Sequence, residues 1–158
     1  MFSALSPNLS LVCALALPVL LVSGCGSATG NPDSPQTVPV SGVIKLDEKP
    51  LPCALVTFIP QTAEQGVECV GMTDAEGRYR LKQIRGKEGA PVGSYTVVVS
   101  SLVDGKGQRI QPGGDLTPAD HGANESLPPR YSSYSDSKLT ATVPAEGGEI
   151  EFALKSKK

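Results

Sequence analysis

The 158-residue sequence has no tryptophan, only one histidine and only four cysteines. Four tyrosines and three phenylalanines are too few to supply a platform on which bases or sugars stack. No excess of positive charge exists either, because 14 Lys and Arg stand against 16 Asp and Glu. Nucleic acid is therefore not an expected partner. We expect no catalytic residues, no cofactor and no metal site from this composition.

Glycine and proline, by contrast, are plentiful, with 17 and 14 residues. They interrupt the chain too often for a helical bundle. The length is that of one ordinary domain, since domains commonly have about 100–200 residues. Short strands joined by turns are the structure that this composition favours.

The N-terminal region is apolar and carries no charged side chain before Asp33. Its longest apolar run is Leu9–Val22, 14 residues interrupted only by Ser10 and Pro18. As a helix this run would reach about 21 Å, short of the ~30 Å core of a bilayer. We therefore expect residues 1–24 to be a signal peptide rather than a permanent span.

The apolar run ends in Val22-Ser23-Gly24-Cys25, which resembles the lipobox of bacterial lipoproteins. Small residues before the cysteine let the peptide enter a protease cleft, and a thiolate is well suited to form a thioether with diacylglycerol. The resemblance implies cleavage before Cys25, acylation (palmitate) and anchoring to a membrane of the cell envelope. The lipid would hold the protein at the outer membrane or at the periplasmic face of the inner membrane. The alternative is an ordinary secretory signal with an incidental cysteine.

Residues 25–39 are expected to be the lipidated cysteine and a flexible tether. The stretch 26–39 reads GSATGNPDSPQTVP, which is rich in Gly, Ser and Pro and shows no apolar periodicity. Such a segment buries too little surface to offset the entropy of ordering it. At roughly 5–6 Å × √n, it would hold the following domain on the order of 20 Å from the lipid.

From Val40 onwards the sequence alternates short apolar segments with turn residues, which predicts an all-β sandwich over residues 40–158. We expect Ala54, Val56 and Phe58 to face the core, and Asp74 and Gly77 to close a turn. The final two strands are expected to form a pair. Seven strands are expected: 40–46, 54–59, 67–73, one through Tyr79 and Leu81, 94–100, 138–143 and 149–154.

Three segments carry a resemblance to carboxypeptidase regulatory-like (transthyretin-like) domains of bacterial envelope lipoproteins, those of planctomycetes especially. They are VSGVIKLDEKPLPCALVTFIP, MTDAEGRYRL and GAPVGSYTVVVS, together with the Pro-Pro-x-Tyr-Ser motif at 128–132. The resemblance covers residues 40–154. It implies a seven-stranded prealbumin-like β-sandwich with no established catalytic activity.

Three functions were weighed for such a domain. The first is a non-enzymatic binding or structural module whose partner is an unknown envelope protein or glycan. The second is a carbohydrate-binding module, against which the missing tryptophan counts. The third is a small hydrolase, for which His121 is the only plausible base. His121 could also bind a cation together with the neighbouring Asp115 and Asp120, but an acidic loop without a cation is the simpler interpretation.

The remaining candidate residues each have a structural alternative. Cys53 and Cys69 could form a disulfide in an oxidising compartment, although a tight hairpin would set Cys69 opposite Phe58, several positions away from Cys53. Arg130, Tyr131 and Tyr134 follow a long loop at 102–130 in which no strand is predicted. They could form a contact surface, or Tyr131 could pack the loop onto the sandwich. Asp74 and Glu76 resemble half of a calcium loop. The other oxygen ligands of such a loop are missing from the sequence, so a solvated turn is the simpler interpretation.

Overall fold

The computed structural model describes residues 36–63, 66–111 and 122–156. All of them belong to one compact unit, Asp33–Lys158. The expected signal peptide, Cys25 and the acidic loop residues Asp115, Asp120 and His121 lie outside the described residues. None of the helices in the described ranges is long and apolar enough to cross a membrane.

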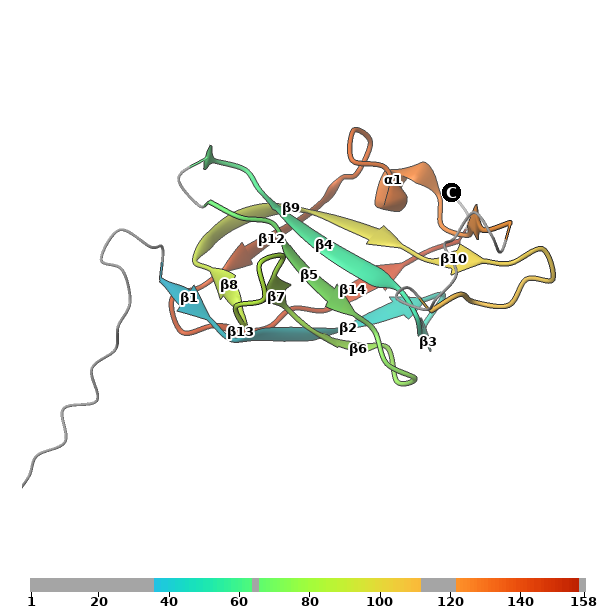
Figure 1. Cartoon of the computed structure of the whole chain (residues 1–158), viewed down its shortest axis with the longest axis horizontal. Helices are drawn as coiled ribbons and strands as arrows, with labels where there is room; N and C mark the ends of the chain where they lie inside the picture. The colour runs from blue at the N-terminus through green and yellow to red at the C-terminus, as the bar shows by residue number, and fades with distance from the viewer. Residues whose placement is uncertain (1–35, 64–65, 112–121, 157–158) are drawn as a thin grey trace, which may run out of the picture. The chain divides into compact units, whose positions relative to one another are not determined.

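The predicted all-β class is confirmed, and the strands form mainly antiparallel sheets (Figure 1). The first sheet has five strands, and all of its pairings are antiparallel. In spatial order the strands are β12 (Leu139–Val143), β9 (Gly93–Ser100), β4 (Leu55–Pro60), β5 (Cys69–Met72) and β7 (Lys82–Gln83).

The second sheet is built around β2 (Val40–Leu46). On one side β2 pairs antiparallel with β6 (Arg78–Arg80) and β3 (Lys49–Pro50). On the other side it pairs parallel with β13 (Gly148–Glu149) and β14 (Phe152–Leu154). The second sheet therefore mixes both strand directions, which is a departure from a simple antiparallel meander.

Two further strand pairs and one short helix complete the described chain. β1 (Thr37–Val38) pairs with β8 (Ala90–Pro91), and β10 (Leu102–Val103) pairs with β11 (Asn124–Glu125). The helix α1 (Pro129–Ser132) is one turn long. The prediction that residues 102–130 contain no strand is therefore wrong. β10 and β11 pair with each other within this segment, and α1 begins before its end.

The segment Arg78–Gln83 crosses from one sheet to the other. Its first half, β6, pairs with β2, and its second half, β7, pairs with β5. Between them lies Leu81, which is buried and whose backbone N–H donates to the Val40 carbonyl over 2.9 Å. Tyr79 and Leu81 are both buried in the core, but the single strand expected here serves two sheets.

The pairing expected for the last two segments is wrong. β12 pairs with β9 in the first sheet, whereas β13 and β14 pair with β2 in the second. The segment 149–154 is also divided, because Ile150 and Glu151 separate β13 from β14. Divisions of this kind, with the short additional pairs, give fourteen strands in the described ranges rather than seven.

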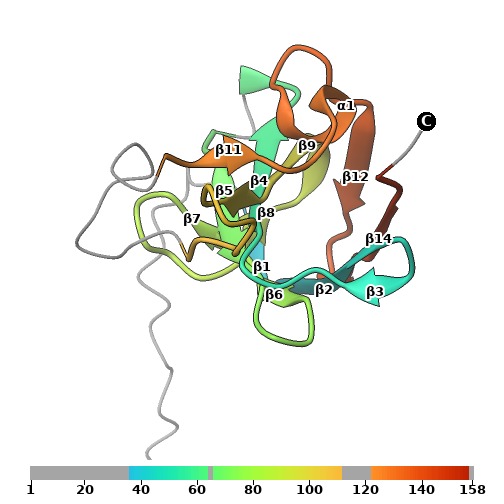
Figure 2. The ribbon, with the colours of Figure 1, turned by 90° about the vertical axis from the view of Figure 1, so that its right-hand side faces the viewer.

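Side chains of both sheets share one core, centred on Phe58 of β4. Its ring lies 5.6 Å from that of Tyr95 and 6.2 Å from that of Phe152, centroid to centroid, so the first sheet contacts the second through aromatic packing. Ala54, Val56 and Phe58 are fully buried, which confirms the core face predicted for this strand. Figure 2 shows β14 and β2 across from β4 and β9.

The two buried tyrosines of the core keep their hydroxyl groups satisfied. Tyr79 Oη donates to the Ile150 carbonyl and Tyr95 Oη to the Pro91 carbonyl, each over 2.7 Å. Burial raises the pKa of Tyr95 to about 12 and raises that of Tyr79 further above its ordinary value. Both phenols are therefore neutral structural donors at physiological pH.

Candidate functional site

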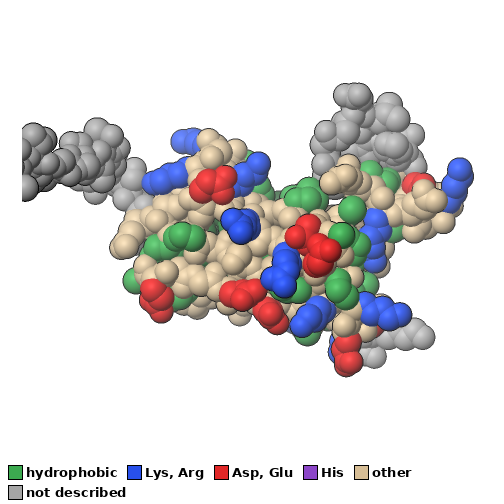
Figure 3. All heavy atoms as spheres, turned by 90° about the horizontal axis from the view of Figure 1, so that it is seen from below, with side chains coloured by type: hydrophobic (Ala, Val, Ile, Leu, Met, Phe, Trp, Pro, Cys, Tyr) green, Lys and Arg blue, Asp and Glu red, His purple; other side chains and the backbone are tan. Residues whose placement is uncertain are grey.

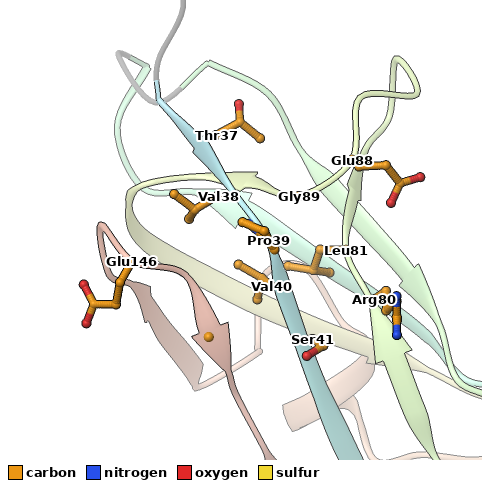
Figure 4. Close-up of a pocket in the computed structure, with 11 residues that line it drawn as sticks. Thr37, Val38, Pro39, Val40, Ser41, Arg80, Leu81, Glu88, Gly89 and Glu146 are labelled. Atoms are coloured by element: carbon orange, nitrogen blue, oxygen red, sulfur yellow. The ribbon is translucent and has the colours of Figure 1, made fainter.

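Two adjoining pockets, of about 600 and 520 Å³, form a groove in the described surface. The two pockets share Ser41, Arg80 and Glu88 in their linings. Figure 4 shows the first pocket between β1 and the start of β2 on one side and Arg80, Leu81 and Glu88 on the other. The groove therefore opens where the chain enters the second sheet.

The groove offers both signs of charge rather than a reactive group. Arg80, Glu88 and Glu146 line the first pocket, and Asp74, Arg78 and Lys82 add to the second. Figure 3, seen from below the view of Figure 1, likewise shows basic and acidic side chains interspersed. In the described part of the chain no three His, Cys, Asp or Glu residues lie close enough to hold a metal. The arrangement suits binding of a polar partner.

The turn between β5 and β6 is closed by Asp74, as the sequence predicts. Its Oδ1 accepts the backbone N–H groups of Glu76 over 3.0 Å and Arg78 over 2.8 Å. Gly77 has φ +73°, and a Cβ there would lie 2.6 Å from the Ile44 carbonyl oxygen. This geometry is an Asx turn, in which the carboxylate accepts hydrogen bonds from the backbone of the turn itself. It agrees with the interpretation of this segment as a solvated turn.

The two cysteines of the described chain are free thiols. The hairpin register predicted for them is confirmed, since Cys69 pairs with Phe58, while the Cys53 backbone N–H donates to the Thr73 carbonyl over 3.2 Å. The register therefore places the two cysteines several positions apart along β4 and β5. Burial raises the pKa of Cys69 to about 11, so this thiol is protonated and a poor nucleophile at neutral pH.

The three residues of the predicted contact surface have different environments. Tyr131 packs partly buried against the core, and Tyr134 is 62% exposed. The Arg130 guanidinium lies 4.8 Å from the centre of the Tyr131 ring and donates to the Lys155 carbonyl over 2.6 Å. The Lys155 N–H in turn donates to Tyr131 Oη over 3.3 Å. A hydrogen bond with Arg130 holds the pKa of Tyr131 below its usual value.

Arg130 and Tyr131 therefore hold the end of the chain that follows β14. Of the three predicted residues, Tyr134 is the one whose side chain is largely accessible to a partner. The structure thus supports the alternative in which Tyr131 packs this region onto the sheets.

The segment after β9 is held by Glu125, a residue that the sequence analysis did not single out. Its Oε1 accepts the backbone N–H groups of Ser101 over 3.0 Å and Leu127 over 2.9 Å, and its Oε2 accepts the Ser100 hydroxyl over 2.6 Å. Arg109 also donates to the Ser101 hydroxyl. An isolated Glu in a Gly- and Pro-rich stretch gives no sequence signal for this role, because two of its three partners, Ser101 and Ser100, lie 24 and 25 positions away.

Replacing Glu125 with alanine should release the two strands β10 and β11 from the end of β9. The change removes a charged acceptor from three donors, so we expect the free energy of unfolding to fall by about 1.5–3 kcal/mol. Urea denaturation measures this loss, and limited proteolysis within 102–125 should accelerate with it. The exposed Glu76 is the matched control, and Glu76→Ala should change neither. Equal stability of the two variants would contradict the anchoring role.

Comparison with known proteins adds no relative to this picture. No family model matches the chain, and neither a curated protein nor a solved structure matches it. The functional argument therefore depends on the residues themselves.

Proposed function

We propose that this chain is a lipoprotein of a bacterial cell envelope, attached to the membrane by lipid on Cys25. The domain that follows would be a non-enzymatic binding or structural module of transthyretin-like β-sandwich type. The observation that carries the proposal is the order of segments in the sequence. An apolar run too short to span a bilayer ends in Val22-Ser23-Gly24-Cys25, and a Gly-, Ser- and Pro-rich stretch whose one charged residue is Asp33 follows directly.

The lipid would supply enough membrane affinity for stable anchoring. Each buried CH₂ contributes about 0.8 kcal/mol, and stable anchoring needs two or more chains. A diacylglyceryl thioether with an acylated amino group provides them at a single residue. In the described part of the chain the strands begin at Thr37, and Val38 is buried in the core. A tether that begins at Cys25 would therefore end before β1 and not at residue 39 as expected.

A role in binding rather than catalysis is supported by where the described titratable groups with shifted pKa values lie. Active sites tend to gather such groups in clefts. Here Cys69 and Tyr95 are enclosed in the core, and the Tyr79 hydroxyl, although its residue lines the groove, is engaged by the Ile150 carbonyl. The groove and the exposed Tyr134 are the surfaces that we propose for a partner of the envelope.

Mass spectrometry of the protein extracted from membranes of a bacterial host tests the proposal. The expected N-terminal peptide begins at Cys25 and carries the mass of a diacylglyceryl group with an additional acyl chain. A chain that begins at Met1 without modification, or a cleaved chain with a free Cys25 thiol, would overturn the lipoprotein assignment.

A further inference from the structure

The segment from Arg78 to Lys87 is the most basic part of the chain. It reads RYRLKQIRGK and holds five of the 14 Lys and Arg residues with no acidic residue. Arg78, Arg80 and Lys82 alternate with the buried Tyr79 and Leu81, so the three cations share the outward side of the strand. The protein as a whole has a net charge of −2, whereas this segment is positively charged.

The segment ends in a tight hairpin, Lys82–Glu88, which we call the basic hairpin. The Gln83 backbone N–H donates to the Lys87 carbonyl, and the Gly86 N–H donates to the Gln83 carbonyl, each over 2.7 Å. The turn presents Ile84 to solvent with 63% of its surface exposed, next to Arg85. Only Ile84 and Tyr134 are large apolar side chains exposed to this degree in the described chain.

The cations of the basic hairpin are not neutralised by ion pairs in the described chain. The two ion pairs there, Lys45 with Glu151 and Lys155 with Glu48, lie elsewhere. Two acidic residues lie next to the hairpin: Glu88 stands across from Lys82, and the Glu68 carbonyl accepts the Ile84 backbone N–H over 3.0 Å. Neither of them forms an ion pair with Arg85 or Lys87 in the described chain. Arg85 and Lys87 at the tip therefore keep their charge available for an external anion.

The basic hairpin is fastened to the first strand of the domain, next to the tether. Gln83 Nε2 donates to Thr37 Oγ1 over 3.0 Å, and a Cβ on Gly89 would lie only 2.3 Å from the Val38 carbonyl oxygen. Figure 4 shows Thr37 and Glu88 at the same end of the pocket, with the hairpin loop extending beyond Glu88. The eleven residues between Cys25 and Thr37 would span roughly 20 Å as a flexible chain.

We propose that the basic hairpin is a second membrane contact, which binds an anionic lipid surface beside the lipid anchor. Arg85 and Lys87 bind headgroup phosphates, and Ile84 enters the interface between headgroups and acyl chains. This inference rests on the proposed function, because the anchor is what brings the hairpin to the surface. Each cation held near an anionic leaflet strengthens the contact about five-fold.

The test uses the full lipidated protein reconstituted in vesicles of phosphatidylethanolamine and phosphatidylglycerol, or of phosphatidylcholine alone. Amine-reactive labelling followed by mass spectrometry reports the accessibility of each lysine. We expect Lys87 to be labelled at least five-fold more slowly on the anionic vesicles, and Lys49 and Lys155 at equal rates on both. Salt at 1 M, where the Debye length is about 3 Å, should remove the difference.

A double variant and a matched control attribute the protection to the hairpin tip. Ile84→Ser with Arg85→Gln should return Lys87 labelling on anionic vesicles to the rate on neutral vesicles. The control is Lys106→Gln in the turn Asp104–Gln108, which has the same backbone hydrogen-bond pattern as the basic hairpin; protection of Lys87 should persist there. Protection that survives in the double variant would overturn the proposal.

Two further outcomes separate this inference from the proposed function. Equal labelling of Lys87 on both vesicles, with the N-terminal peptide lipidated at Cys25, would remove the second contact and leave the anchor intact. An unmodified N-terminal peptide would remove both. If inorganic phosphate protects Lys87 from labelling on neutral vesicles, the hairpin tip binds a small anion. This result would overturn the membrane contact.

Discussion

Replacing Cys25 with serine should abolish lipid attachment and leave the precursor uncleaved. The serine hydroxyl has nearly the same size as the thiol, so the peptide still fits the processing enzymes, but it is far less able to form the bond to diacylglycerol. In lipoprotein maturation the lipid precedes cleavage, so the signal peptide stays in place. Metabolic labelling with a palmitate analogue should give no signal in the variant, and its apparent mass should exceed that of the mature chain.

The sequence provides a matched control within the apolar run itself. Cys13 is a second cysteine in the same stretch, but no small residues precede it in the order seen at 22–25. Cys13→Ser should therefore be labelled and processed like the parent protein. Lipid labelling that persists in Cys25→Ser and disappears in Cys13→Ser would show that the attachment site was assigned to the wrong residue.

Replacing Gly42 with alanine should destabilise the domain more than any single change at its surface. Gly42 pairs with Tyr79 between β2 and β6, and a Cβ there would lie 1.8 Å from the Ile150 carbonyl oxygen and 2.8 Å from Tyr79 Cε1. The methyl group must displace the backbone that accepts the Tyr79 hydroxyl. Overpacking together with loss of this hydrogen bond predicts a fall of about 3–5 kcal/mol in the free energy of unfolding.

Chemical denaturation of both alanine variants measures this effect against a neutral glycine. Gly105 has open space where its Cβ would be, and Gly105→Ala should change stability by less than about 0.5 kcal/mol. The midpoint for Gly42→Ala should fall well below that for Gly105→Ala, or the variant should be insoluble. Midpoints that agree would contradict the close approach of Ile150 to β2.

The groove and the basic hairpin share residues, and this has a consequence for binding. Arg80 lines both pockets, Lys82 lines the second, and both belong to the strand that leads into the hairpin tip. If the tip rests on the membrane, a partner in the groove is held close to the leaflet. The exposed Tyr134 belongs to the segment after α1.

Local features of the fold were predicted correctly because neighbouring residues determine them. The alternation of Ala54, Val56 and Phe58 fixed the buried face of one strand, and the short connection to the next strand placed Cys69 opposite Phe58. The turn at Asp74 and Gly77 followed from the side-chain acceptor and the positive φ that these residue types supply.

The pairing of distant segments was beyond the same reasoning. Strand 149–154 was expected beside 138–143 because the two are adjacent in sequence, yet each pairs with a strand at least 40 residues away. The basic character of residues 78–87 is visible in the sequence, but its attachment to Thr37 depends on a hydrogen bond between segments far apart.

The sequence by itself determined the all-β class, the apolar run that ends at Cys25 and the turn chemistry, because each depends on residue type and short-range spacing. The tertiary structure alone decided that Arg78–Gln83 would join both sheets, that Glu125 would fasten the segment after β9, and that a cationic hairpin would be bonded to β1. Those features arise from long-range packing, in which a residue's partner is chosen by how the two sheets enclose one core and not by its neighbours in the chain.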